Sequence, residues 1–205
     1  SFTTRRVLAK QNKKTIFIMS ASFNKKMTGI NHQIPMPNLA QPEGLKSTLD
    51  QISEIEKSNP KMHHRLKSVL PRAFDIRPVE AFLPKYSKNG KPFDNIWFTT
   101  SDKLNHSDIA MHHQLLAYAS DYNLLSTATL PHVEELQNKS MFYASLDHAL
   151  WFHRDFRIDD WLLYAMDSPS ASNSRGFSRG SIFNKKGELI ASVAQEGLIS
   201  ELIKK

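Results

Sequence analysis

The feature that most constrains the fold is a single segment that favours a helix but has almost no polar face. Ser107 and Asp108 can cap a helix that continues to about Ser120, and this stretch carries apolar or small side chains on most faces. A helix of that kind has to be covered on most of its surface. Two strand-like segments precede it and four follow it. We therefore predict an α+β domain in which an antiparallel sheet encloses a central helix.

The predicted strands are rich in β-branched and aromatic residues and are bounded by turn residues. The last two are separated by Asn184-Lys185-Lys186-Gly187, a typical hairpin turn. The strands are expected at 74–82, 95–100, 141–153, 161–167, 177–183 and 189–195.

The first 71 residues have a different organisation. Segments 3–9 and 15–23 predict a hairpin with a polar turn between them. Four prolines then interrupt the chain, and only 45–56 has apolar residues at helical spacing. We expect strands of a first, partial domain at 1–24, a linker with a short helix at 25–71 and a self-contained domain at 72–205.

Composition narrows the range of functions. The chain has no cysteine, which excludes disulfides, a thiolate zinc site and a cysteine nucleophile. Because no stretch approaches ~18 consecutive apolar residues, we expect no membrane insertion. The first residues also lack the apolar run of a secretory signal, so we expect a cytoplasmic location.

The net charge of +7 is concentrated near the N-terminus. Residues 1–68 hold 12 Lys or Arg against 4 Asp or Glu, whereas residues 69–205 hold 15 against 16. An anionic partner such as coenzyme A or a nucleic acid would suit this basic half, and so would simple solvation.

Three polar residues lie in segments that otherwise predict burial: Asp121, Ser145 and Gln195. A buried carboxylate, hydroxyl or amide costs a few kcal/mol unless it is hydrogen-bonded, so the three groups are best satisfied by one another. Gln195 is the clearest anomaly, because it shares a strand face with Leu189, Ala191 and Val193. A glutamine bonded to nearby backbone is the alternative interpretation.

The surroundings of the other two residues favour a catalytic role. Asp121 follows the predicted helix, whose macrodipole is negative at that end and disfavours a carboxylate, so we expect it to accept a proton readily. Counting by two along 141–153 places Ser145 on the less apolar face of the predicted strand. The alternative for Asp121 is a turn residue that bonds nearby amides. Together the three groups are suited to holding a water for hydrolysis.

A rival enzymatic signal is the G-x-S-x-G pattern formed by Gly176, Ser178 and Gly180. In a nucleophile elbow an acid and then a histidine follow the serine. Here the last histidine, His153, and the last aspartate, Asp167, both precede it. We therefore interpret the segment as a strand.

Histidines suggest two further sites, neither of which the spacing supports. Adjacent helical residues diverge, and no carboxylate cluster accompanies the pairs at 63–64 and 112–113, so we predict no metal site. Asp147 and His148 would point to opposite faces of a strand, and we assign His148 a structural role. The aromatic stretch 151–154 would form either the wall of an acyl channel or plain core.

Several separated segments resemble, in order and spacing, the type II acyl-CoA thioesterase family, whose subunit is a double hotdog. The resemblance implies one complete C-terminal hotdog, an antiparallel sheet wrapped around a central helix, and the remaining part of an N-terminal one, as in a member truncated at its N-terminus. The segments are 1–23, 77–80, 119–123, 145–154, 170–177 and 194–197.

The resemblance also implies a reaction. The catalytic aspartate, threonine and glutamine positions of the family align with Asp121, Ser145 and Gln195. Serine replaces the threonine of the familiar bacterial members, which keeps the hydroxyl but frees a rotamer. The expected activity is hydrolysis of fatty acyl-CoA to free fatty acid and CoA by an activated water, without a covalent intermediate, metal or separate cofactor.

Two other functions compete with hydrolysis. One is a catalytically inactive hotdog that binds acyl-CoA or scaffolds an oligomer, and the other is a basic RNA-associated module. We favour the enzyme and expect fatty acyl-CoA rather than nucleic acid as the partner. Exposed sheet edges and the family resemblance both favour a homo-oligomer. The residues that bind CoA are not identified from the sequence.

Overall fold

The computed structural model describes residues 2–82, 88, 90–104 and 108–202. Contacts divide the chain into two compact units, Ser1–Gln33 and Ile34–Lys205. Ser107, one of the two expected capping residues, lies outside the described residues.

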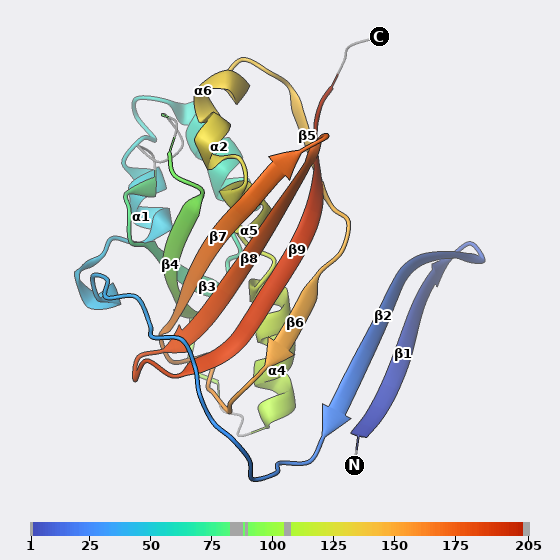
Figure 1. The fold of residues 1–205 in the computed structure, drawn as a ribbon. Helices are drawn as coiled ribbons and strands as arrows, with labels where there is room; N and C mark the ends of the chain where they lie inside the picture. The colour runs from blue at the N-terminus through green and yellow to red at the C-terminus, as the bar shows by residue number, and fades with distance from the viewer. Residues whose placement is uncertain (1, 83–87, 89, 105–107, 203–205) are drawn as a thin grey trace. The chain divides into compact units, whose positions relative to one another are not determined.

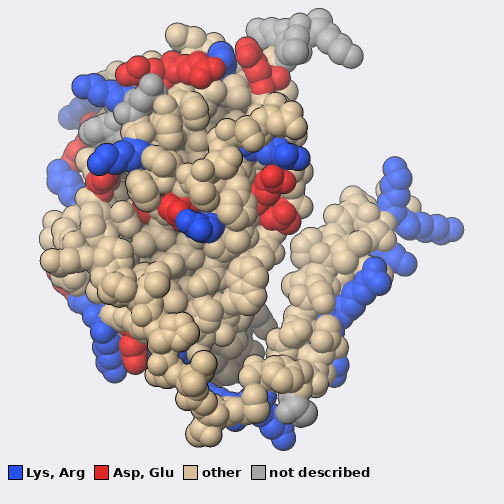
Figure 2. Space-filling model, in the orientation of Figure 1, with Lys and Arg blue, Asp and Glu red and all other residues tan. Residues whose placement is uncertain are grey.

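The smaller unit contains the predicted hairpin. Strands β1 (Phe2–Gln11) and β2 (Lys14–Asn24) pair antiparallel, and both residues between them, Asn12 and Lys13, have positive φ. This backbone matches the twist of the two strands. The unit holds seven Lys or Arg and no Asp or Glu, and Figure 2 accordingly shows only blue charged groups on the hairpin.

The larger unit contains short helices followed by a long sheet. Its elements are η1 (Pro42–Gly44), α1 (Thr48–Ser53), α2 (Pro60–Val69), β3 (Phe74–Pro78), β4 (Phe93–Thr100), α4 (Ile109–Ala119), α5 (Leu124–Thr127), η2 (Leu130–His132), α6 (Val133–Leu136), β5 (Met141–Ser145), β6 (Ala149–Phe152), β7 (Leu162–Ser172), β8 (Arg175–Asn184) and β9 (Leu189–Glu201).

The strands form one antiparallel sheet in the order β3-β4-β7-β8-β9-β5, and β6 also pairs with β9. Figure 1 shows β7, β8 and β9 side by side, with β5 and β6 along the outer edge of β9. Asp108 caps α4 by accepting from the Ala110 amide at 2.9 Å. The predicted helix and the strands after it are therefore present, but a meander of all four strand regions is wrong: β7, β8 and β9 follow one another in the sheet, whereas β5 and β6 lie beside β9.

Both faces of the sheet are buried at its centre. On one face, Leu116 of α4 and Leu124 of α5 pack with alternate residues of β4, β7 and β9. On the other, the segment 36–45 covers Trp97, Leu163 and Phe183. Residues 34–71, which the sequence assigns to the linker, thus lie in the larger unit.

Helix α4 is only partly buried. Leu116 and Ala119 lie in the core, whereas Tyr118 is 62% exposed although its ring stacks on Phe74 of β3.

A helix at Pro60–Val69 was not predicted from the sequence. Its N-terminal signals are nevertheless present, because the Asn59 side chain accepts from the Met62 amide and proline occupies the first turn. The predicted helix at 45–56 is shorter than expected and spans only Thr48–Ser53, with Ser47 and Asp50 forming a capping box.

The predicted single strand at 141–153 is wrong, because the chain breaks between β5 and β6. Ser145 pairs with Gly197 and Ala149 pairs with Ala194. Three residues, 146–148, therefore oppose two on β9. Such an extra residue reverses which face each later side chain occupies.

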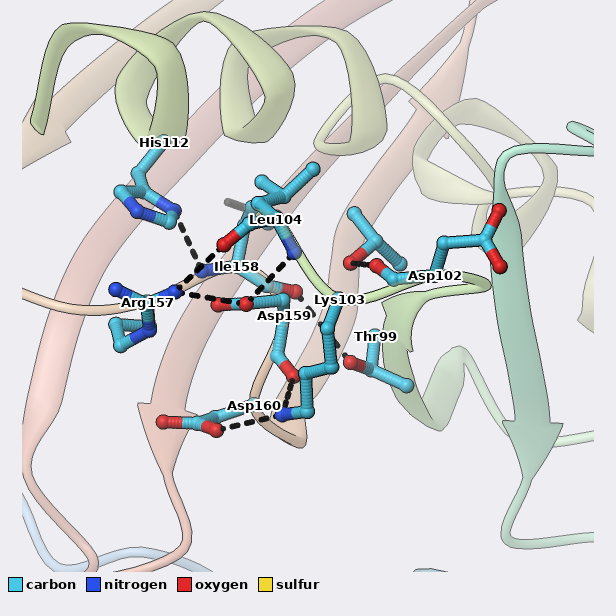
Figure 3. A network of polar contacts seen from close by, with 10 residues as sticks. Thr99, Asp102, Lys103, Leu104, His112, Arg157, Ile158, Asp159 and Asp160 are labelled. Atoms are coloured by element: carbon cyan, nitrogen blue, oxygen red, sulfur yellow. Dashed lines mark hydrogen bonds and ion pairs between the residues drawn. The ribbon is translucent and has the colours of Figure 1, made fainter. Parts of the chain in front are cut away.

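A polar network fixes the chain near the start of α4 (Figure 3). The buried Asp159 carboxylate accepts from the Leu104 amide at 3.0 Å and from Arg157 at 2.8 Å. Burial raises the pKa of Asp159, but its hydrogen bonds and the positive charge of Arg157 together outweigh burial and hold the pKa below its ordinary value. Lys103 adds a bond to Asp160 at 3.1 Å.

Candidate active site

Asp121, Ser145 and Gln195 come together at one place in the larger unit. The Ser145 hydroxyl donates to Asp121 Oδ1 at 3.4 Å, and Gln195 Nε2 donates to Ser145 Oγ at 2.9 Å. Asp121 directly follows α4, Ser145 ends β5 and Gln195 lies within β9. Residues far apart in the sequence thus form one chain of hydrogen bonds.

The sheet register explains why Ser145 and Gln195 meet. Ser145 pairs with Gly197, and Gln195 lies two residues before Gly197 on the same strand, so both side chains occupy one face. Gln195 is only 1% exposed, whereas Asp121 and Ser145 are exposed. The group therefore runs from the core to the surface.

His148 is a fourth member that sequence reasoning missed. Its Nδ1 lies 2.5 Å from Gln195 Oε1, and its Nε2 lies 2.9 Å from Ser120 Oγ. The prediction placed His148 and Ser145 on opposite faces of one regular strand. The extra residue between β5 and β6 moves His148 to the face of Ser145 and Gln195.

Tyr164 supports the helix end that carries Asp121. Its hydroxyl donates to the Ser120 carbonyl at 2.8 Å, and the side chain is fully buried. Burial, together with the charge of Asp121, raises the pKa of Tyr164 well above its ordinary value, so the hydroxyl remains a donor. The ring lies where a side chain of Gly180 would be, since an added Cβ would come within 2.1 Å of it.

Two hollows adjoin Asp121. One, of about 270 Å³, is lined by polar and apolar groups that include Asp121, Asn123, Ser145 and Gln195. The other, of about 130 Å³, is mostly apolar and is lined by Val69, Pro71, Phe74, Ile76, Ile96, Phe98, Tyr118, Ala119, Asp121 and Tyr122. Asp121 therefore borders both a polar and an apolar space.

The G-x-S-x-G segment lies inside β8, as the strand interpretation requires. Ser178 is fully buried, so it is not presented to solvent as an elbow serine would be. The flanking glycines serve packing instead. A Cβ on Gly176 would meet Ala128 at 2.6 Å, and one on its partner Gly197 would meet Leu125 at 2.5 Å.

The other sequence candidates do not join the site. His112 Nδ1 accepts from the Ile158 amide at 3.2 Å, and His113 stacks on Phe152. Among the described residues, no three His, Asp or Glu side chains are grouped as a metal site. Trp151 and Phe152 are 53% and 40% exposed and line neither hollow. No helix in the described ranges has the length and hydropathy needed to cross a bilayer.

Comparisons with known proteins agree on one family. The family model for acyl-CoA thioesterase matches residues 72–198. Acyl-coenzyme A thioesterase 8 of Homo sapiens is 36% identical over 206 residues, which cover 97% of this chain and 64% of the human protein. The chain thus spans less than two thirds of the mammalian relatives it matches.

Solved structures agree with the sequence comparisons. Acyl-CoA thioesterase II of Mycobacterium marinum is 38% identical, with a TM-score of 0.77, over 98% of this chain and 70% of that one. A protein with a hot dog fold from Alicyclobacillus acidocaldarius is only 12% identical, with a TM-score of 0.69, over 99% of this chain and 69% of that one. That similarity concerns the fold alone and confirms the predicted hotdog. By sequence and structure together, this chain belongs to the acyl-CoA thioesterase family.

Proposed function

We propose that this chain hydrolyses fatty acyl-CoA to free fatty acid and CoA by means of an activated water. The observation that carries the proposal is the hydrogen-bonded series Asp121, Ser145 and Gln195, which borders a hollow large enough for a water and a thioester. Membership of the acyl-CoA thioesterase family supports the choice of substrate.

Each of the three side chains has a distinct role in the proposed reaction. The Asp121 carboxylate accepts a proton from water while the Ser145 and Gln195 groups hold the oxygen in place. That oxygen bonds to the thioester carbon, and collapse of the tetrahedral intermediate breaks the carbon–sulfur bond. The proton on Asp121 then passes to the departing thiolate. The balanced products are a carboxylic acid and CoA, and the steps use no cofactor, metal or covalent acyl-enzyme.

The apolar hollow on the other side of Asp121 supports an acyl substrate. Ile76, Ile96 and Phe98 line it. A hydrocarbon chain that enters this hollow would move out of water and into contact with apolar side chains, which is favourable. In the proposed complex, the acyl group of the substrate lies next to Asp121 and its carbonyl lies next to Ser145 and Gln195.

The test is a hydrolysis assay on the purified chain with acyl-CoA substrates and a thiol reagent. Asp121→Asn keeps the size of the side chain and its ability to accept from Ser145 but removes the base, so we expect kcat to fall by about 10²- to 10⁴-fold. Because Asp121 is exposed, the free energy of unfolding should change by less than about 0.5 kcal/mol.

Asp147→Asn is the matched control. Asp147 accepts from the Glu196 amide at 2.9 Å and does not line the hollow. Asparagine keeps that acceptor, so kcat should stay within a few-fold of the original, about the range of a neutral surface change. Full activity of Asp121→Asn would end the assignment of the base. A wild-type chain that binds acyl-CoA without hydrolysing it would instead indicate an inactive binding protein.

The organisation of the wider molecule is also a proposal. We assign residues 1–24 to a first, partial hotdog, residues 25–71 to a linker and residues 72–205 to the second hotdog. The hairpin exposes Ile16, Phe17 and Ile18 by 62%, 54% and 59%, and exposed apolar strands favour association. We therefore expect a homo-oligomer, and a monodisperse monomer in sedimentation would contradict it. The expected location is the cytoplasm.

A further inference from the structure

His148 connects the buried end of the candidate site to the end of helix α4. One ring nitrogen lies 2.5 Å from the Gln195 carbonyl oxygen and the other 2.9 Å from the Ser120 hydroxyl. Ser120 is fully buried, and Tyr164 holds its carbonyl at 2.8 Å. The imidazole is therefore held from both sides by groups that have little freedom to move.

The direction of these hydrogen bonds follows from the contact between Ser145 and Asp121. A carboxylate only accepts, so at this contact the Ser145 hydroxyl must donate. Its oxygen can then only accept from Gln195, which must present its NH₂ group to Ser145 and its carbonyl oxygen to His148. The carbonyl oxygen requires a donor, so His148 carries its proton on Nδ1. Its Nε2 then accepts from the Ser120 hydroxyl, whose single proton points to the imidazole instead of to the Ala117 carbonyl at 3.0 Å.

The reverse direction is chemically complete but conflicts with Asp121. A flipped Gln195 amide would donate to His148 Nδ1, His148 would donate to Ser120, and Ser120 would donate to the Ala117 carbonyl, 3.0 Å away. The Ser145 hydroxyl would then donate its proton to the Gln195 carbonyl oxygen. The lone pairs of the Ser145 oxygen would face the Asp121 carboxylate, which is repulsive.

We propose that His148 is a positioning residue that sets the orientation of the Gln195 amide through an Nδ1–H donor. This role rests on the proposed hydrolysis, because it matters for turnover only if the Gln195 NH₂ group holds the water or the developing oxyanion. A buried amide with one face fixed by a donor cannot rotate to present its oxygen to the site. The extra residue between β5 and β6 is what brings the imidazole to this face.

The first test is spectroscopic and does not depend on activity. At about pH 8, where an ordinary histidine is neutral, ¹⁵N correlation spectra of the imidazole distinguish the two tautomers. We expect His148 to be protonated on Nδ1. Protonation on Nε2 would overturn the proposed orientation of the amide, whether or not the chain hydrolyses any substrate.

The second test compares two substitutions of equal size. His148→Asn places an amide NH₂ near the position of Nδ1 and can still donate to Gln195. His148→Asp places a carboxylate there, which can only accept and should turn the amide around. We expect kcat to fall by less than about 10-fold for His148→Asn and by about 100-fold or more for His148→Asp, with KM changing far less than kcat.

His153 provides the matched control, because it adjoins the other end of β6 and also bonds a residue of β9. Its Nε2 lies 2.8 Å from the Ser192 hydroxyl. His153→Asn and His153→Asp should have the same kcat within a few-fold, as expected for a surface site. Equal losses for His148→Asn and His148→Asp would overturn the positioning role. An inactive wild-type chain would refute the proposed hydrolysis, and the tautomer would still decide the hydrogen-bond direction.

Discussion

Substituting Gly180 with alanine should destabilise the protein through a clash with Tyr164. The new Cβ would lie 2.1 Å from Cε2 of the ring and 2.9 Å from Cζ, whereas ordinary contacts begin at 3.4 Å. The ring would have to move by more than 1 Å at its edge. Its hydroxyl is hydrogen-bonded to the Ser120 carbonyl, and the ring forms a T-shaped pair with Phe98, with the two ring centroids 6.3 Å apart.

The expected cost can be built from these contacts. Overpacking of a filled core costs about 1–3 kcal/mol, and loss of a buried hydrogen bond adds about 1–3 kcal/mol if the carbonyl is left unpaired. We expect Gly180→Ala to lower the free energy of unfolding by about 2–4 kcal/mol. For a chain of this length the midpoint of thermal unfolding should fall by about 5–15 °C.

Denaturant unfolding of four variants tests the cause as well as the size. Gly44→Ala, where no atom lies within 4 Å of the added Cβ, should change stability by less than about 0.5 kcal/mol. Tyr164→Leu removes the ring atoms that meet the new methyl group, so Gly180→Ala should cost at least about 1.5 kcal/mol less in that background. An equal cost in both backgrounds would refute the clash with Tyr164 as the cause.

Two further variants probe the buried polar groups. Asp159→Asn should lower the free energy of unfolding by about 2 kcal/mol at neutral pH. The pKa of Asp159 in the folded protein is below its ordinary value of 3.8. The ionised carboxylate therefore stabilises the fold fully above pH 3.8, and this contribution is lost as the pH falls through the folded pKa. The stabilities of the two proteins should accordingly converge in acid. Gln195→Met should change stability by less than about 1.5 kcal/mol, since solvent can satisfy the exposed Ser145 and His148, while kcat falls by about 100-fold. A large loss of stability with kcat retained would show that the glutamine is structural.

Sequence patterns predicted much of the architecture because they reflect local burial. The apolar faces of α4 and the alternating residues of β7, β8 and β9 are each visible within one segment. Gln195 stood out for the same reason, as a polar residue on an apolar strand face. The side chains of Asp121, Ser145 and Gln195 were found together as expected, although their catalytic role stays a prediction.

The rest depended on tertiary contacts that no single segment contains. The break after Ser145 exists because β5 and β6 share one partner strand with an unequal number of residues. Without that register, counting by two placed His148 on the wrong face. Helix α2 was missed because its apolar residues are few, although Asn59 and Pro60 formed a recognisable start.

The unequal pairing beside β9 also affects how this chain would tolerate the loss of a residue during evolution. Removing one residue between Ser145 and Ala149 would let β5 and β6 merge into a single regular edge strand with its ladder to β9 intact. If residue 146 or 147 were lost, His148 would stay directly before Ala149, opposite Gln195, and would keep its face; loss of His148 itself would bring Asp147 to that position. A descendant could therefore shorten this connection and keep both the hotdog and the imidazole, so the residue directly before Ala149, and not the length of the connection, is the feature by which to sort related chains.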